Sequence, residues 1–137
     1  MTPYTHKVNY YETDKMAITH HSNYIRYMEE ARIDFLEKIG FPFERIEAEG
    51  IISPVIKIEY SFRKTTTFAD VISIEVKVEK ITPVKLTFSY TLTCKGEVCG
   101  LGKSEHCFLN ASGTPIIVEK EKPELFKALK ETMAENA

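Results

Sequence analysis

Three consecutive stretches of this chain alternate between apolar and polar residues with a period of two. Such alternation places every second side chain on one face of a strand, so each stretch predicts a strand with one buried face. Only "EKITP" separates the second stretch from the third, which predicts an antiparallel hairpin, and "CKGEV" leads into a fourth strand over residues 97–110. The apolar positions are Ile56, Ile58, Tyr60 and Phe62, then Ile72, Ile74, Val76 and Val78, then Val84, Leu86, Phe88, Tyr90 and Leu92.

A long helix is predicted before this sheet. It begins at Ser22 or Asn23, either of which suits an N-cap, and ends at Gly40, which tolerates the left-handed backbone of a helix C-terminus. A less regular strand over residues 6–12 and a short helix after Pro123 complete an α+β layout, with one helix on a curled antiparallel sheet. A step of ~100° per residue gathers the apolar side chains of the long helix into one arc that faces the sheet. The arc holds Tyr24, Ile25, Met28, Ala31, Phe35, Leu36 and Ile39.

Three features interrupt these patterns. Arg32 lies within the apolar arc, where an unpaired guanidinium would be costly, and Glu29 stands three residues earlier, so we expect the two to pair. Ile33 lies on the opposite, polar side of the helix, either by chance or at a contact with another subunit. Gly100 and Gly102 in the fourth strand predict a β-bulge or a close approach by another part of the backbone.

The composition excludes several classes of protein. The 137 residues fit a single domain over 1–137, and 43% hydrophobic with 28% charged residues are typical of a globular fold. A net charge of -2 offers no basic surface for nucleic acid, and no apolar run approaches the ~20 residues of a membrane span. The cysteines follow no CxxC spacing, and the N-terminus lacks the apolar core of a signal peptide, so we expect a cytoplasmic protein with reduced thiols. The cysteines are Cys94, Cys99 and Cys107.

The stretch "YETDKMAITHHSNYIRYMEEAR", residues 11–32, combines an acidic residue with the start of the long helix. Asp14 is expected to end the first strand, residues 15–20 to form a loop, and the amides around His21 to lie unpaired at the helix N-terminus. That terminus carries a partial positive charge and stabilises an oxygen on which negative charge develops. An aspartate is ionised at neutral pH and can attack a carbonyl carbon or activate a water molecule. The two groups together predict acyl-transfer chemistry.

The segments "YYETDKMAITHHSNYIRYMEEAR" and "EAEGIISPVIKIEYSFRKTTTFADVISIEV" resemble the hotdog-fold acyl-CoA thioesterases of the 4-hydroxybenzoyl-CoA thioesterase type. The family pattern reads Y-x-x-T-D-x-x-G-x-x-x-H-x-x-Y-x-x-x-x-E-x-A-R. This pattern lies within the first 32 residues, and the similarity covers nearly the whole chain. The positions in register are Asp14, His21, Tyr24, Glu29, Ala31 and Arg32.

The resemblance implies both an architecture and a mechanism. The sheet would wrap around the long helix, two chains would join their sheets edge to edge with the active site between them, and such dimers often pair into tetramers. Asp14 would act as nucleophile or general base on the thioester carbonyl of an acyl-CoA, while the backbone amide of His21 would polarise the carbonyl oxygen. The resemblance implies neither a metal nor a redox cofactor.

Two positions depart from the family pattern. Ala17 stands where the family has a glycine, so a positive φ at this position would strain the loop by about 1 kcal/mol, or the loop takes another path. Thr65 replaces a proline within the segment Arg63-Lys64-Thr65-Thr66, which predicts a looser loop after the first strand of the hairpin region.

Most of the candidate site residues have a second interpretation. Asp14 could cap a turn, and the imidazole of His21 could point to solvent or contact the substrate or Asp14. Glu29 is an alternative catalytic carboxylate, because a sister group of hotdog thioesterases carries its carboxylate on the central helix. His20 and His21 lack the spacing of metal ligands, so no metal site is expected. Three substrate-binding candidates, Ser22, Asn23 and Tyr24, lie at the helix start, and Tyr24 could also belong to the core. Two further candidates are Arg63 and Lys64, which could bind CoA phosphates or simply be solvated cations.

Two alternative functions also fit the sequence. One is a hotdog module that binds acyl-CoA without hydrolysing it, and the other is a thioesterase for acyl groups on acyl carrier protein. Hydratase or dehydratase chemistry ranks last, because the chain lacks the D-x-N-P-x-H arrangement which that chemistry would use. The identity of the acyl group does not follow from the sequence.

Overall fold

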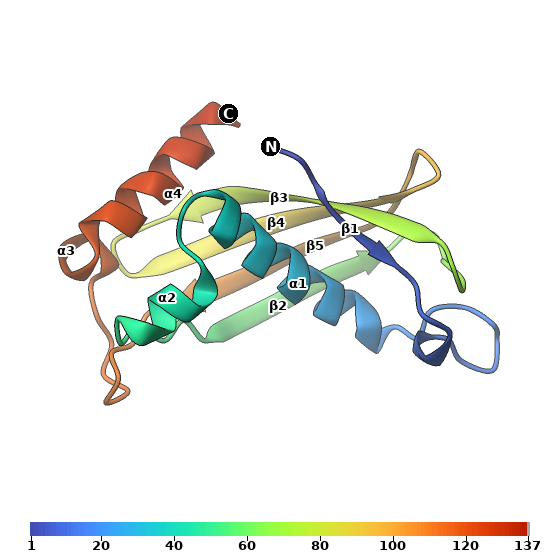
Figure 1. The fold of residues 1–137 in the computed structure, drawn as a ribbon, viewed down its shortest axis with the longest axis horizontal. Coiled ribbons are helices and arrows are strands. Elements are labelled where there is room, and N and C mark those ends of the chain that lie inside the picture. The colour runs from blue at the N-terminus through green and yellow to red at the C-terminus, as the bar shows by residue number, and fades with distance from the viewer. Residues whose placement is uncertain (137) are drawn as a thin grey trace.

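The computed structural model describes residues 1–136. One long helix, α1, lies along one face of an antiparallel sheet, and α3 and α4 stand at one end of that sheet (Figure 1). The elements are β1 (Tyr4–Lys7), a 3-10 turn η1 (Tyr10–Glu12), α1 (Ser22–Lys38), α2 (Phe43–Ala48), β2 (Val55–Phe62), β3 (Val71–Ile81), β4 (Lys85–Cys94), β5 (Glu97–Cys107), α3 (Val118–Glu121) and α4 (Pro123–Glu135).

The sheet has five strands in the order β1-β3-β4-β5-β2, and each strand is antiparallel to its neighbours. The hairpins β3–β4 and β4–β5 confirm the connections predicted from the short turns between the alternating stretches. β2 lies at one edge of the sheet and pairs only with β5 among the residues that the structure describes. The α+β layout predicted from the sequence is therefore confirmed.

The helix α1 ends as predicted, but the prediction of Ser22 or Asn23 as its N-cap is wrong, because His21 occupies the N-cap position and makes no side-chain capping bond. Ser22 is its first residue, Lys38 its last, and Gly40 follows with a φ of 94°, which a residue with a side chain adopts only under strain. α4 likewise begins at Pro123, whose missing N–H costs nothing in the first turn. No helix within residues 1–136 is both long and apolar enough to cross a membrane.

The buried face of α1 differs from the predicted arc at two positions. Ile25 is 38% exposed, whereas Tyr27, which the arc leaves out, is fully buried. The cause is the N-terminal segment, which covers the helix on the side of Tyr27: the ring of His6 in β1 lies 4.2 Å from the Tyr27 ring. The remaining core residues of the helix face the sheet, and Phe35 packs edge-on against Phe88 of β4.

The strand predicted over residues 6–12 is wrong in its extent. β1 covers only Tyr4–Lys7, and the chain then turns into η1, so Asp14 lies in a loop rather than at a strand end. Hydrogen bonds of the Glu12 carboxylate hold this turn, because one of its oxygens accepts from the Asn9 amide at 2.7 Å and lies 2.9 Å from Nε2 of His6. These contacts replace the ladder hydrogen bonds that a longer strand would make.

The fourth predicted strand is three residues shorter than expected. β5 ends at Cys107, after which Leu109 makes only isolated bridges with Ile52 and Pro115. The turn that follows is closed by the side chain of Asn110, whose Oδ1 accepts from the amides of Ser112 and Thr114, each at 3.0 Å.

Side chains of other elements pass close to the two glycines of β5. A Cβ added at Gly100 would overlap the hydroxyl of Tyr60, and one at Gly102 would lie 2.6 Å from Sδ of Met28. The ladder between β4 and β5 also shifts register at Cys99, beside Gly100. This shift is the β-bulge that the sequence analysis predicted for this segment. The predicted β-bulge is thus confirmed, whereas the alternative of a close backbone is wrong, because the groups that approach the glycines are the side chains of Tyr60 and Met28.

Candidate active site

A pocket of about 340 Å³ opens at the N-terminus of α1. It brings together residues from the Asp14 loop, the helix start and the loop after β2, which lie some 50 positions apart in the chain. Five of the predicted site residues line it. Its walls are formed by Asp14, Met16, Ile18, Thr19, His21, Tyr24, Phe62, Arg63, Lys64 and Thr65.

The loop that carries Asp14 closes on itself. The Asp14 amide donates to the carbonyl of Ile18 at 3.0 Å, and the Ala17 amide donates to the carbonyl of Asp14 at 3.0 Å. Oδ1 of Asp14 also accepts from the Met16 amide at 2.8 Å. Asp14 therefore caps its own turn with one oxygen and lines the pocket as well, so the two interpretations of this residue are compatible.

Ala17 adopts the left-handed conformation that the family glycine would suit, with a φ of 63°. A Cβ in this region crowds the following carbonyl and costs roughly 1–2 kcal/mol. Of the two outcomes expected for Ala17, the loop thus shows the strained backbone. The carbonyl of Ala17 accepts from Oγ1 of Thr67 at 2.7 Å, which ties the strained residue to the loop after β2.

The prediction of a looser loop after β2 is wrong, because threonines anchor this loop. Thr66 is buried, its carbonyl accepts from the Thr19 amide at 2.8 Å, and its Oγ1 lies 2.6 Å from Oγ1 of Thr19. The hydroxyl of Tyr24 lies 3.0 Å from the same Oγ1 atom. These bonds supply the order that a proline would otherwise give.

One backbone amide at the start of α1 is unpaired, and it belongs to a residue that lines the pocket. His21 is the N-cap residue and has exposed surface, and its backbone N–H has no hydrogen-bond acceptor among residues 1–136. The next amides are less available, because those of Asn23 and Tyr24 donate to the carbonyls of His20 and His21 at 3.0 and 3.3 Å. The ring of His21 stacks on that of His20, with centroids 4.2 Å apart, and makes no side-chain hydrogen bond to Asp14.

Ser22 and Asn23, predicted to bind substrate, do not line this pocket. Asn23 is buried, and its Nδ2 donates to the carbonyls of Glu12 and His20 at 2.9 and 3.2 Å. Its side-chain amide therefore holds the Asp14 loop against the helix start. Ser22 is exposed, and its Oγ lies 2.9 Å from Nδ1 of His20. Tyr24 fills both predicted roles, since it is 4% exposed and still lines the pocket.

Glu12 is a residue that the sequence analysis did not single out. Its backbone carbonyl accepts from the His20 amide at 2.8 Å and from Nδ2 of Asn23 at 2.9 Å, which joins the Asp14 loop to the helix start. Burial alone would raise the pKa of its carboxyl group, but hydrogen bonds from the Asn9 amide and from His6 outweigh burial and lower that pKa. The N-x-x-E spacing of Asn9 and Glu12 was the signal that could have identified it.

Arg63 and Lys64 lie exposed at the mouth of the pocket. Their backbone amides both donate to the carbonyl of Cys99, at 3.0 and 3.1 Å, which fixes where the two side chains leave the chain. The ammonium group of Lys64 forms an ion pair with Glu97 of β5. This pairing lowers the pKa of Glu97, whose carboxylate accepts a hydrogen bond from Lys64.

Glu29, the alternative catalytic carboxylate, lies outside this pocket. Its side chain is 65% exposed on α1, and Oε2 stands 3.8 Å from Nη2 of Arg32. The predicted pairing of these residues is confirmed as a long ion pair. Within residues 1–136 no group of three or more histidine, cysteine, aspartate or glutamate side chains is arranged to hold a metal ion, and the three cysteines form no disulfide there.

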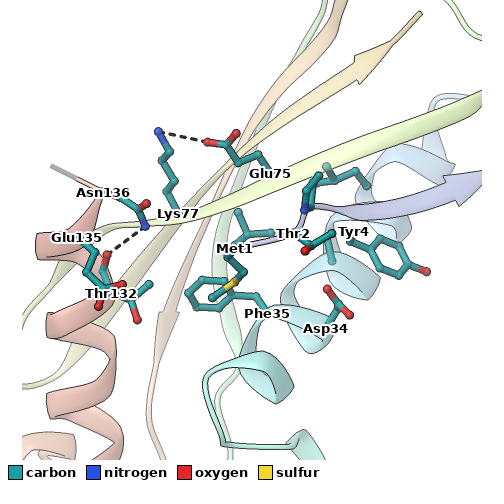
Figure 2. Close-up of a pocket in the computed structure, with 14 residues that line it drawn as sticks. Met1, Thr2, Tyr4, Asp34, Phe35, Glu75, Lys77, Thr132, Glu135 and Asn136 are labelled. Carbon is teal, nitrogen blue, oxygen red and sulfur yellow. Dashed lines mark hydrogen bonds and ion pairs between the residues drawn. The ribbon is translucent and has the colours of Figure 1, made fainter. Parts of the chain in front are cut away.

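Another hollow, of about 270 Å³, lies where the N-terminal residues, α1, β3 and the end of α4 meet (Figure 2). The side chain of Met1 reaches toward Phe35 in this hollow, and Lys77 pairs with Glu75 at 3.2 Å on its rim. Asp34 faces the same space but is paired with Lys38 at 2.6 Å. No helix N-terminus opens into it, so it lacks the combination of groups found around Asp14.

Comparison with known proteins identifies the family. The family model described as the thioesterase-like superfamily matches residues 8–133. The chain belongs to this thioesterase-like superfamily. The match covers α1, the four strands β2 to β5 and most of α4 but not β1, and it includes every candidate site residue described above.

Three relatives show how far the similarity extends. A candidate esterase of Aquifex aeolicus is 32% identical over 90% of this chain and 96% of its own length. A candidate acyl-CoA thioesterase of Bacillus subtilis is 30% identical over 86% of this chain and 87% of its own length. The crystal structure of a DHNA-CoA thioesterase from Staphylococcus aureus superposes with a TM-score of 0.93 at 28% identity, over 98% of this chain and 92% of that chain.

These findings confirm the resemblance on which the sequence analysis relied. The thioesterase-like protein has the α+β hotdog fold, in which a five-stranded antiparallel sheet packs against one long helix. It is a thioesterase, and therefore a hydrolase.

Proposed function

We propose that this protein hydrolyses acyl-CoA thioesters with Asp14 as the reacting carboxylate and the backbone amide of His21 as the oxyanion donor. The observation that carries the proposal is their meeting in one pocket: Asp14 lines it from the loop, and the unpaired N–H of His21 lies at the start of α1. A helix N-terminus favours negative charge, and a preorganised donor there acts without reorganisation during the reaction.

Two routes use the same groups. In the first, the Asp14 carboxylate takes a proton from water while the water oxygen bonds to the thioester carbonyl carbon; the carbon–sulfur bond then breaks, and the thiolate receives the proton. In the second, the carboxylate itself bonds to that carbon and expels the thiolate, and water hydrolyses the resulting anhydride. In both routes the carbonyl oxygen becomes negative and accepts from the His21 amide.

The substrate carrier is CoA in this proposal. Two relatives support it by their names, an acyl-CoA thioesterase and a DHNA-CoA thioesterase. Arg63 and Lys64 at the pocket mouth would bind the CoA phosphates, with Lys64 exchanging its partner Glu97 for a phosphate group. Acyl carrier protein remains the alternative carrier, and a module that binds acyl-CoA without hydrolysing it is the alternative function.

The same proposal includes one domain over the whole chain and a cytoplasmic location.

The assembly in this proposal is a homodimer joined through β2, with pairing of two dimers as its extension. β2 is an edge strand of eight residues, and four of its seven exposed side chains are apolar, which is the kind of edge that pairs with another chain. The apolar residues exposed along it are Val55, Ile56, Ile58 and Phe62.

The test is thiol release from a panel of acetyl-, medium-chain, long-chain and aromatic acyl-CoAs by wild type and by Asp14→Asn. Asparagine keeps the oxygen that accepts from the Met16 amide, so the loop should keep its turn while the rate falls by about 10²–10⁴. Asp34→Asn is the matched control, since Asp34 lies on α1 away from this pocket and should leave the rate unchanged. Turnover of Asp14→Asn at the wild-type rate would contradict the mechanism, and saturable binding without release would favour the binding module.

A further inference from the structure

The ring of Tyr60, in β2, lies between α1 and two residues of β5 that have no side chain. A Cβ added at Gly100 would overlap the Tyr60 hydroxyl, and one at Gly102 would lie 3.2 Å from Cδ1 of the same ring. On the opposite face of the ring, Tyr24 of α1 stacks at a centroid distance of 5.2 Å. Tyr60 thus fills a narrow space between Tyr24 and the backbone of Gly100 and Gly102, which we call the glycine slot.

The glycine slot begins directly behind the wall of the Asp14 pocket. Tyr24 and Phe62 line that pocket, whereas Tyr60 does not. The Tyr60 ring packs edge-on against Phe62 at a centroid distance of 4.8 Å, and Phe62 is the register partner of Gly100 in the sheet. Two residues of strand span about 7 Å. Without the ring, the pocket would therefore extend by about that length along β5.

Packing alone holds the Tyr60 ring in the slot. Its hydroxyl is buried and has no hydrogen-bond partner among residues 1–136. A buried tyrosine hydroxyl usually finds such a partner, and leaving it without one costs stability. The ring also points inward over β5 rather than along the free edge of β2. The volume of the ring, and not a polar contact, is therefore what closes the slot.

The glycine slot has the shape that an unbranched acyl chain requires. It is narrow, and beyond Gly102 it ends at the fully buried side chain of Met28. With Tyr60 in place, a chain that reaches Tyr24 and Phe62 has to turn back toward solvent, so its further methylene groups stay in water and contribute no burial. The surroundings of a deleted ring relax only partially, and an apolar space of this kind binds apolar molecules rather than water.

We propose that Tyr60 is a specificity-determining residue, whose ring closes the glycine slot and restricts the enzyme to short acyl groups that end in front of Tyr24 and Phe62. The inference rests on the proposed thioesterase function, because it takes the Asp14 pocket as the site of the acyl group. It follows that longer unbranched chains become good substrates when the ring is removed.

The test compares butanoyl-CoA with decanoyl-CoA as substrates of wild type, Tyr60→Ala and Phe126→Ala. Phe126 is a buried ring of α4 that does not line the Asp14 pocket, so its replacement controls for a general loss of packing. In wild type and Phe126→Ala, kcat/KM should fall at least tenfold from butanoyl- to decanoyl-CoA. In Tyr60→Ala the ratio of decanoyl to butanoyl values should rise at least tenfold, since each newly buried methylene group is worth about fourfold.

Two further variants keep the test decisive if alanine disrupts the edge strand. Tyr60→Leu keeps an apolar side chain over Gly102 but leaves the Gly100 end of the slot empty, so it should shift the ratio in the same direction by less. Tyr60→Phe restores the ring and should restore the wild-type ratio. A wild type that hydrolyses decanoyl-CoA as well as butanoyl-CoA would overturn the proposal. Folded Tyr60→Ala or Tyr60→Leu proteins with the wild-type ratio would overturn it as well.

A binding measurement keeps the inference separate from catalysis. 1-Decanol should raise the melting temperature of Tyr60→Ala by at least about 3 °C more than it raises those of wild type and Tyr60→Phe. If no thioester is hydrolysed but this difference is seen, the proposed function fails while the role of the Tyr60 ring stands. If 1-decanol affects the three proteins equally, the ring does not close a slot and the inference fails, whatever the result with thioesters.

Discussion

The side-chain amide of Asn23, at the start of α1, donates a hydrogen bond to the backbone carbonyl of Glu12 at 2.9 Å. Glu12 stands two residues before Asp14, so this bond fixes the loop that carries the carboxylate to the helix that offers the amide of His21. The His20 amide donates to the same carbonyl at 2.8 Å. The relative position of the two reacting groups in the proposed mechanism thus depends on one carbonyl oxygen.

Replacing Asn23 with alanine should therefore impair the reaction as well as the fold. The change leaves a buried carbonyl with one donor fewer, which costs about 1–3 kcal/mol in the free energy of unfolding. We expect kcat to fall by about tenfold or more, because Asp14 is displaced relative to the His21 amide. Urea denaturation and thiol release measure the two effects. Ser22→Ala, which removes only an exposed hydroxyl bonded to His20, is the control, and a variant with reduced stability but the wild-type kcat would contradict the positioning role.

Glycine at position 17 should stabilise the protein. Ala17 has a φ of 63°, and glycine adopts this conformation without the Cβ strain, although its more flexible unfolded chain offsets part of the gain. The free energy of unfolding should rise by up to about 1 kcal/mol, as measured by chemical denaturation. Ala111→Gly, at an exposed loop position outside the left-handed residues, should instead lower it slightly. A destabilised Ala17→Gly protein would show that the conformation at this position is not strained.

Acid should destabilise the protein by protonating the carboxylate of Glu12, which holds the turn before Asp14. The pKa of Glu12 is lowered in the folded protein, so its contribution to stability is full above the unfolded pKa, near 4.3, and is lost as the pH falls through the folded pKa. Urea midpoints between pH 7 and pH 3 should fall more steeply in wild type than in Glu12→Gln, whose stability at pH 7 is lower. Parallel curves for the two proteins would mean that the pKa of Glu12 is the same in both states.

Neutralising Glu97 should improve binding of a CoA substrate. Glu97 holds the ammonium group of Lys64 at the pocket mouth, so Glu97→Gln frees that cation for a phosphate group. KM should fall by about two- to fivefold with kcat unchanged, since exposed ion pairs are weak, and the gain should shrink as salt is added. Glu59→Gln, which breaks a similar exposed pair with Lys57 in β2, should not change KM. A KM that stays constant in Glu97→Gln would remove Lys64 from the phosphate site.

Pairing through β2 should respond to a charge placed on that edge. Wild type should have at least the mass of a dimer by light scattering, and Ile58→Lys, at an exposed apolar position of β2, should shift the mass toward the monomer. Val71→Lys introduces the same charge at an exposed position of β3 and should leave the mass unchanged. A monomeric wild type, or an Ile58→Lys protein with the wild-type mass, would rule out this interface.

Periodic segments were predictable from the sequence, and irregular ones were not. The alternation from Ile72 to Val78 and the glycine at position 40 each depend on residues close in the chain, so β3 and the end of α1 were found where expected. The end of β1 depends instead on the carboxylate of Glu12, which reaches back to the Asn9 amide and to His6 and stops the strand. A period of two carries no information about such a bond.

The same distinction applies to the site. Asp14 and His21 share a local pattern, and the pocket does bring them together. The roles of Asn23 and Thr66 were not predictable, because the partners of Thr66 lie more than 40 residues away along the chain and Asn23 bonds a backbone atom that any residue would supply. An apolar cavity of about 150 Å³ beside Arg32 was not predictable either, because it forms only when five elements, α1, α2, α4, β4 and β5, pack together.

Gly100 shapes a pocket that it does not touch. Its missing side chain admits the hydroxyl end of Tyr60, and the Tyr60 ring stacks on Tyr24, with centroids 5.2 Å apart and planes at 14°. Tyr24 in turn forms part of the pocket wall at the start of α1. A residue larger than glycine at position 100 would displace the Tyr60 ring and, through the stack, the Tyr24 ring in the pocket wall. The absence of a Cβ at Gly100 thus helps to set the space that the pocket offers to an acyl group.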